Sequence, residues 1–152
     1  MYVSDFTWRE PVTIDVAETI TTAARRLAEH GVGALVVVDE DRPVGIVTDR
    51  DLVVRVLARG ADAAGRIDGV MSMGVVALDA DDDVEELYAV FGRHAIRRVP
   101  VVDHDRVVGM ISLDDAVVST SSQMAALSGV LSTQIAFPHA RDEAEPPAVV
   151  AD

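Results

Sequence analysis

The chain has 152 residues, of which 49% are hydrophobic and 4% aromatic, a size that fits one domain or two half-size units sharing a core. Its formal net charge is −13, and all 13 basic residues are arginine, so the surface repels nucleic-acid backbones and we expect no nucleic-acid partner. The absence of cysteine excludes disulfides, thiol catalysis and zinc–thiolate sites, and no apolar run approaches the roughly 20 residues of a membrane span. We expect no membrane partner and, without a signal-like N-terminus, a cytoplasmic location.

Residues 1–60 predict elements in the order β-α-β-β-α. A short strand at 12–14 leads into a helix whose N-cap is Thr19. The Val-rich run at 35–38 indicates a strand buried on both faces, and a polar turn joins it to a second strand at 44–47. These two strands therefore form a predicted hairpin.

A second helix is expected to begin after Thr48 and to end at Gly60, a typical C-terminal glycine. Residues 61–69 are the predicted linker to the second half of the chain. Four residues at helical spacing are expected to form the apolar face of this helix: Leu52, Val53, Val56 and Leu57.

The second half repeats the first at a constant shift of 64 residues. The segment 45–51, Gly-Ile-Val-Thr-Asp-Arg-Asp, returns at 109–115 as Gly-Met-Ile-Ser-Leu-Asp-Asp, and the Val-Val-Asp of 37–39 returns at 101–103. A repeat of this length is one supersecondary unit used twice. We therefore predict a mixed α/β (α+β) fold in which two β-α-β-β-α units face each other about a pseudo-twofold axis and form paired clefts.

The repeat ends at residue 118, and the chain continues with two segments of different character. Residues 119–137 predict a C-terminal helix, because Met124, Leu127, Leu131 and Ile135 lie three to four positions apart. Residues 138–152 are acidic and contain proline, and we predict that they are disordered.

A hydroxyl and a carboxylate recur three residues apart where each hairpin leads into a helix: Thr48 with Asp51, and Ser112 with Asp115. One interpretation is a capping box that satisfies the free N–H groups of the helix start. The other is a binding site, in which the Asp accepts hydrogen bonds from a ribose diol while the hydroxyl and the helix N-terminus face a phosphate. The two interpretations do not exclude each other.

These motifs, with Ile-Arg-Arg-Val-Pro-Val at 96–101 and Val-Met-Ser at 70–72, make the chain resemble a pair of CBS domains, or Bateman module, over residues 1–118. The resemblance makes 1–60 the first CBS repeat and 70–118 the second. It implies two clefts for adenosine-containing ligands such as AMP, ADP, ATP, S-adenosylmethionine or NAD-type molecules, and a disc-like homodimer. It places ribose contacts at Asp51 and Asp115 and their hydroxyl partners at Thr48 and Ser112. It also implies an adenine pocket among Ile14, Leu35, Val36, Leu78, Val99 and Pro100.

The two repeats differ at one informative place. Arg97 and Arg98 of the second repeat stand where the first has Gly33 and Ala34. Similar modules use a basic residue here to reach phosphate, and a guanidinium offers bidentate hydrogen bonds to phosphate oxygens. We therefore predict phosphate contacts from both arginines and two inequivalent clefts; the alternative is that they pair with surface acids.

The sequence shows no catalytic constellation, and its four histidines lack metal-ligand spacing. We predict a regulatory module, not an enzyme, that binds an adenine nucleotide and acts through an unknown protein target. One alternative is a dimeric protein-interaction module whose clefts have degenerated. Another is an enzyme acting on a nucleotide, for which the sequence offers only the predicted clefts.

Overall fold

The structure, a computed structural model, describes residues 1–6 and 8–136, with side chains up to residue 129. The chain divides into two compact units, residues 1–116 and 117–152. The first unit holds both repeats and both sheets. Of the second unit, the structure describes the helical residues 117–136, so the predicted disordered tail at 138–152 lies outside the described residues.

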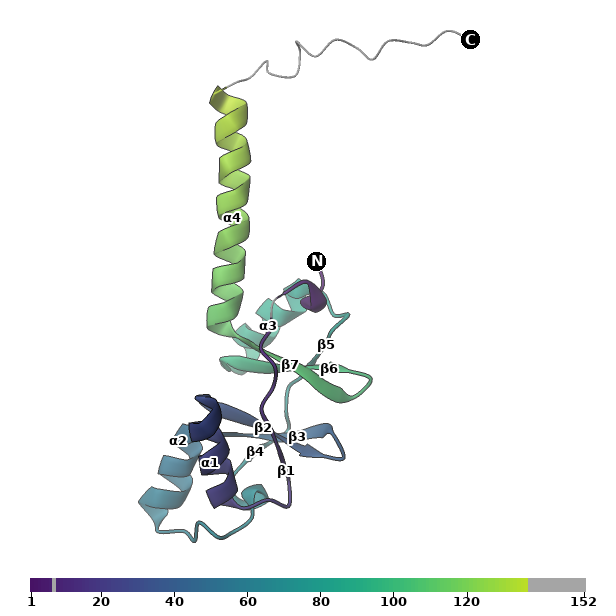
Figure 1. The fold of residues 1–152 in the computed structure, drawn as a ribbon. Coiled ribbons are helices and arrows are strands. Elements are labelled where there is room, and N and C mark those ends of the chain that lie inside the picture. Colours follow the sequence, from purple (N-terminus) through teal and green to yellow (C-terminus); the bar gives the residue numbers. More distant parts are fainter. Residues whose placement is uncertain (7, 137–152) are drawn as a thin grey trace. The chain divides into compact units, whose positions relative to one another are not determined.

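The first sheet has four strands in the order β1-β2-β3-β4, and Figure 1 shows it beside helix α1 (Ile20–His30). Strand β1 pairs with β2 in parallel, whereas the β2–β3 hairpin and the β3–β4 pair are antiparallel. The residues of β2 at 34–38 are all buried, as their continuous apolar run predicts. The strand bounds are β1 Thr13–Asp15, β2 Ala34–Asp39, β3 Arg42–Thr48 and β4 Ser72–Met73.

The second sheet repeats this arrangement with three strands in the order β5-β6-β7. Strand β5 pairs with β6 in parallel, and β6 forms an antiparallel hairpin with β7, in the same register as the first hairpin. The duplicated mixed fold predicted from the sequence is therefore confirmed. The bounds are β5 Leu78–Asp79, helix α3 Val84–His94, β6 Arg98–Asp103 and β7 Arg106–Ser112.

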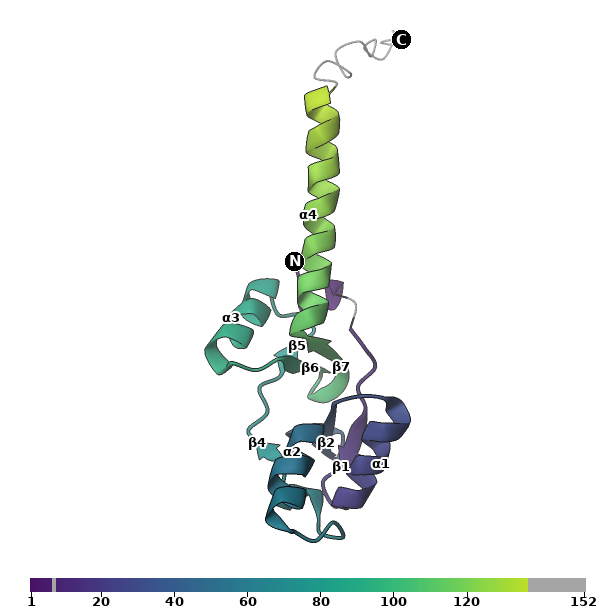
Figure 2. The same ribbon diagram turned by 90° about the vertical axis from the view of Figure 1, so that its left-hand side faces the viewer.

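The two hydrophobic cores are each completed by a segment that precedes the strands of a repeat. Val3, in the 3-10 turn Val3–Asp5, and Phe6 pack into the core of the second repeat. Ile67, Val70 and Met71, which lie between the repeats, pack into the core of the first. Figures 1 and 2 both show the N-terminal turn beside the second sheet. Because each half is completed by a segment outside its own strands and helices, the two repeats form one body.

The predicted linker also closes the N-terminus of α1. The side chain of Thr19 accepts a hydrogen bond from the backbone N–H of Thr22 at 3.2 Å, which confirms the predicted N-cap. The next free N–H groups, of Ile20 and Thr21, donate to the carbonyls of Gly65 (2.9 Å) and Ala63 (3.0 Å). Residues 61–69 are thus hydrogen-bonded to the N-terminus of α1.

The helix after Thr48 differs from its predicted form. It starts as α-helix at Asp49–Asp51 (α2), continues as π-helix over Leu52–Val56, and closes with a 3-10 turn at Leu57–Arg59 before Gly60. The wider π turn rotates the later residues away from α-helical spacing. The predicted four-residue apolar face is therefore wrong in part, because Val56 is buried whereas Val53 and Leu57 are 54% and 75% exposed.

The corresponding helix of the second repeat, α4 (Leu113–Ala136), runs without interruption through the residues predicted as a separate C-terminal helix. Gly60 ends the first helix in the left-handed region at φ 64°, and Met124 stands at the equivalent position in the second. No glycine therefore stops α4 there. Among the described helices, none is long and apolar enough to cross a membrane.

Candidate functional site

The Thr48 motif forms a complete capping box at the start of α2. The backbone N–H of Asp51 donates to Thr48 Oγ1 at 3.1 Å, and the backbone N–H of Thr48 donates to Asp51 Oδ2 at 2.9 Å. The Thr48 hydroxyl donates to the same Oδ2 at 3.0 Å. The capping interpretation is therefore confirmed for this motif, and it holds one carboxylate oxygen of Asp51 in a fixed position. The other oxygen, Oδ1, lies 3.4 Å from Nε of Arg55.

The Ser112 motif repeats these bonds at the start of α4. The N–H of Asp115 donates to Ser112 Oγ at 3.1 Å, and Asp115 Oδ2 accepts from the Ser112 N–H and hydroxyl. Its Oδ1 lies 3.5 Å from Nη2 of Arg9. Burial opposes the ionisation of Asp115, but the hydrogen bonds from Ser112 and the charge of Arg9 outweigh it, so the pKa of Asp115 lies below its ordinary value.

A cavity of about 380 Å³ joins the motif of the first repeat to the arginines of the second. Thr48 and Asp51 of the first repeat line it together with Arg97 and Arg98 of the second. Four of the six predicted polar contacts therefore meet at one cavity, here called the first cavity. Its apolar wall consists of Ala34, Ile46, Met73, Val75, Val76 and Ile96.

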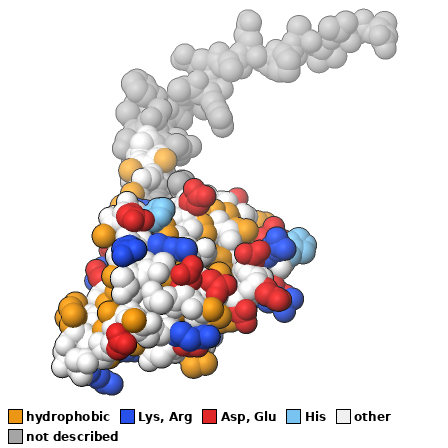
Figure 3. All heavy atoms as spheres, turned by 60° about the horizontal axis from the view of Figure 1, so that its bottom comes forward, with side chains coloured by type: hydrophobic (Ala, Val, Ile, Leu, Met, Phe, Trp, Pro, Cys, Tyr) orange, Lys and Arg blue, Asp and Glu red, His pale blue; other side chains and the backbone are white. Residues whose placement is uncertain are grey.

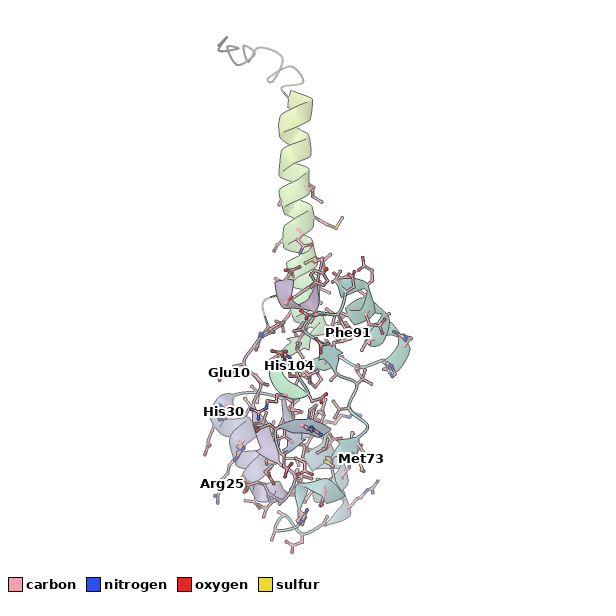
Figure 4. The ribbon with its side chains drawn as sticks, turned by 90° about the vertical axis from the view of Figure 1, so that its right-hand side faces the viewer. Glu10, Arg25, His30, Met73, Phe91 and His104 are labelled. Carbon is pink, nitrogen blue, oxygen red and sulfur yellow. The ribbon has the colours of Figure 1, made fainter. Side chains whose placement is uncertain are left out.

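A second cavity, of about 240 Å³, is lined by Ser112 and Asp115 together with Arg9 and Glu10. Arg98 also lines this cavity, whereas Arg97 lines the first alone. Met73 of the first cavity and Glu10 of the second lie on opposite sides of the first unit in Figure 4. The two cavities are thus inequivalent in their lining, and a single guanidinium borders both.

The two adjacent arginines have different partners. Arg97 donates to Asp114 at 3.2 Å, which is the predicted alternative of pairing with an acid, but both side chains are at least 70% exposed and such a pair is weak. The guanidinium of Arg98 forms no hydrogen bond or ion pair with the described residues, and it lies, like the carboxylate of Asp49, beside Gly33. An anion in the first cavity would therefore displace no hydrogen-bond or ion-pair partner of the Arg98 guanidinium among the described residues. Over the face in Figure 3, acidic and basic side chains are interspersed.

The residues proposed for the adenine pocket lie in the core. Each has less than 4% of its surface exposed, and none lines either cavity. The apolar wall of the first cavity comes instead from residues beside them, such as Ile46 on β3 and Val76 before β5. The six residues concerned are Ile14, Leu35, Val36, Leu78, Val99 and Pro100.

Arg55 is a site residue that the sequence analysis missed. Besides Asp51, its guanidinium contacts the Val70 carbonyl (2.7 Å) and Ser72 Oγ (3.2 Å). It therefore ties the carboxylate of Asp51 to Ser72, which also lines the first cavity. The available signal was its position four residues after Asp51 on one helix. The second repeat has Ser119 at this position.

The glycine that opens each motif makes room for a crossing segment. A Cβ on Gly109 would lie 2.6 Å from the ring of Trp8, and one on Gly45 would collide with the side chain of Met71. The segments that cross there pair with the hairpins, through Arg9 with Met110 and Met73 with Gly45. These crossings bring Arg9 and Met73 to the cavity walls.

The family profile of the CBS domain matches residues 3–58 and 65–119 of this chain. The chain belongs to the CBS-domain family. The CBS domain-containing protein YhcV of Bacillus subtilis is 33% identical over 128 residues, which span 84% of this chain and 91% of that protein. The fold thus contains two CBS domains in tandem, as the resemblance implied.

Solved structures of CBS-domain pairs share this fold. The CBS domain protein PAE2072 from Pyrobaculum aerophilum, complexed with AMP, has a TM-score of 0.68 and 29% identity, covering 76% of this chain and 89% of that one. The CBS domain pair of MJ0100, in complex with 5′-methylthioadenosine and S-adenosyl-L-methionine, has a TM-score of 0.70 and 28% identity, covering 81% and 98%. Some similar CBS pairs therefore bind adenosine-containing ligands.

Proposed function

We propose that this protein is a regulatory CBS pair, not an enzyme, that binds an adenine nucleotide in its first cavity. The observation that carries the proposal is the meeting, at one cavity, of a capped Thr48–Asp51 motif with Arg97 and Arg98 of the other repeat. Its volume lies within the range of small-molecule sites, about 300–1,000 Å³. The AMP complex of a similar CBS pair supports this assignment.

The chemistry of the lining gives each part of a nucleotide a partner. The apolar wall accepts the base, and the lone pairs of Asp51 that are not used within its motif accept hydrogen bonds from the ribose hydroxyls. The guanidiniums of Arg97 and Arg98 bind the phosphate, to which they offer charge-assisted hydrogen bonds. The nucleotide would displace Asp114 from Arg97, at low cost because that pair is exposed.

The regulatory step follows from the position of the cavity between the repeats. A ligand held by Asp51 of one repeat and Arg98 of the other favours the arrangement in which both contacts form. It shifts the population only by its differential affinity for the two arrangements. The output then passes, in the cytoplasm, through a surface recognised by a partner protein.

A homodimer belongs to this proposal. Val53, Val54 and Leu57, on the helix that follows the first motif, are 54%, 46% and 75% exposed. Large apolar side chains gathered on one short helical segment favour burial against another protein surface. We assign that surface to a second copy of the chain. If instead dimerisation proceeds normally and no adenine ligand binds, the protein is an interaction module with degenerate clefts.

The test is isothermal titration calorimetry of the full chain with AMP, ADP, ATP and S-adenosylmethionine. We expect at least one of the nucleotides to bind, and the substitution Asp51→Asn to weaken that ligand at least about tenfold by removing the charged acceptor. Asp81→Ala is the matched control, because it removes an exposed carboxylate that lines neither cavity. Equal weakening by both substitutions, or none by Asp51→Asn, contradicts the proposed site.

A further inference from the structure

The linings of the two cavities carry opposite net charge. The first contains the guanidiniums of Arg97 and Arg98, the imidazole of His94 and a single carboxylate, that of Asp51. With histidine counted as neutral, the formal charges of these side chains sum to +1. The second contains two guanidiniums, of Arg9 and Arg98, against three carboxylates, and so sums to −1. A phosphate group therefore meets attraction in the first cavity and repulsion in the second. The three carboxylates are those of Glu10, Asp114 and Asp115.

The two guanidiniums of the second cavity differ in how far they are available to a phosphate. Arg9 lies 3.5 Å from Asp115 Oδ1, so its charge offsets the carboxylate of the motif itself. Arg98 borders both cavities, and a phosphate bound in the first would hold it there. Gly33 permits this shared position, since a Cβ on residue 33 would lie 3.3 Å from Nη2 of Arg98. Occupation of the first cavity thus leaves the second more acidic.

The second cavity nevertheless retains the groups that bind a nucleoside. Asp115 and Ser112 hold the same capping geometry as Asp51 and Thr48, and the pKa of Asp115 below its ordinary value keeps the carboxylate ionised. Val12, Val32 and Met110 supply apolar surface for a base. The cavity is also smaller, at about 240 Å³ against about 380 Å³.

From this contrast we propose that the second cavity is a separate site for a nucleoside without a phosphate group, and that it rejects nucleotides. The proposal deepens the proposed function, on which it rests for the way the capped motif binds ribose. The carboxylates that line the cavity outnumber its guanidiniums, and they select against phosphate by repulsion between like charges. One chain then holds a nucleotide and a nucleoside at the same time.

The experiment uses the full chain with Asp51→Asn and Thr48→Val, which disable the first cavity and change no residue that lines the second. Adenosine and AMP are the calorimetric probes. We expect adenosine to bind about one per chain and AMP at least about tenfold more weakly. Adding Asp115→Asn is expected to abolish adenosine binding. AMP binding as tightly as adenosine, or adenosine binding that is absent or insensitive to Asp115→Asn, overturns the proposal.

A charge variant gives a second, independent readout. In the same background, Glu10→Gln raises the net charge of the second cavity by one and is expected to reduce the preference for adenosine over AMP. Glu29→Gln, an exposed change on α1 outside both cavities, is expected to leave the preference unchanged. An unaltered preference in Glu10→Gln overturns the electrostatic selection. Failure of the proposed function shows separately, as wild-type AMP binding that Asp51→Asn does not weaken.

Discussion

Asp51 and Asp115 make the same hydrogen bonds to their own motifs but meet different guanidiniums. Arg55 approaches Asp51 from the same helix and is fixed by two further hydrogen bonds, whereas Arg9 approaches Asp115 from the N-terminal segment with a 79% exposed side chain. The first carboxylate is therefore part of a braced wall. The second has a partner that a ligand can replace at little cost, because exposed ion pairs are weak.

The contacts of Arg55 with Asp51, Val70 and Ser72 predict that it positions the carboxylate of Asp51. Arg55→Ala removes the link between Asp51 and the segment at 70–72, and we expect it to weaken AMP binding about tenfold, since hydrogen bonds to charged groups contribute about 1.5–3 kcal/mol. Arg59→Ala, in the following 3-10 turn, is the control and should leave the affinity unchanged. Calorimetry measures both. Equal affinities in the two variants would show that the wall holds its shape without Arg55.

The lowered pKa of Asp115 gives a pH-dependent prediction. Because the folded pKa lies below the ordinary value of 3.8, ionised Asp115 stabilises the fold above that pH, and this stabilisation is lost as the pH falls through the folded pKa. Arg9→Ala removes one cause of the shift. We expect it to lower the free energy of unfolding near neutral pH by no more than about 1 kcal/mol, and not at all well below the folded pKa. Urea unfolding at several pH values measures this, and a constant difference across the range refutes the coupling.

At the scale of elements, the repeated pattern predicted the two hairpins, helix α1 and the start of each helix at Thr48 and Ser112. These follow from local signals: apolar runs, a cap, and a hydroxyl followed by a carboxylate. The π-helix at Leu52–Val56 has no such signal, and it placed Val53 and Leu57 in solvent. The cavity walls were also beyond prediction, because segments distant in sequence form them by crossing at glycines.

The crossing glycines make a prediction about stability. Gly109→Ala places a methyl group against the Trp8 ring, and overpacking of this kind costs about 1–3 kcal/mol. Gly92→Ala is the matched control, since a Cβ at this position would contact nothing within 4 Å. Residue 92 lies inside helix α3, where alanine is favoured over glycine by about 0.5–1 kcal/mol. Urea unfolding should therefore show changes of opposite sign. A stabilised Gly109→Ala protein would mean that Trp8 has room to move aside.

The two halves of the first unit are held together because each hydrophobic core contains residues from a segment outside the strands and helices of its own repeat. The N-terminal segment completes the second core, and the segment between the repeats completes the first. Strands β3 and β7 of the two sheets are also in contact, and the backbone N–H of Val107 donates to the carbonyl of Asp41 at 3.5 Å. Neither repeat of about 50 residues could bury enough surface alone. The ligand proposed to bind between the halves would therefore act on one cooperative body.

Cooperativity of this kind is tested by Phe6→Ala. Phe6 is 5% exposed in the second core, and truncating a buried phenylalanine costs about 3–5 kcal/mol through lost burial and the cavity left behind. Because the cores are linked, Trp8 fluorescence, which reports on the second core, and far-ultraviolet circular dichroism, which reports on both, should shift together to lower urea. Val118→Ala, at a position that is 66% exposed, should move neither transition by more than about 0.5 kcal/mol. If Phe6→Ala shifts the fluorescence transition and leaves part of the dichroism transition in place, the first repeat folds without the second, and a ligand that bridges them cannot act on a single two-state body.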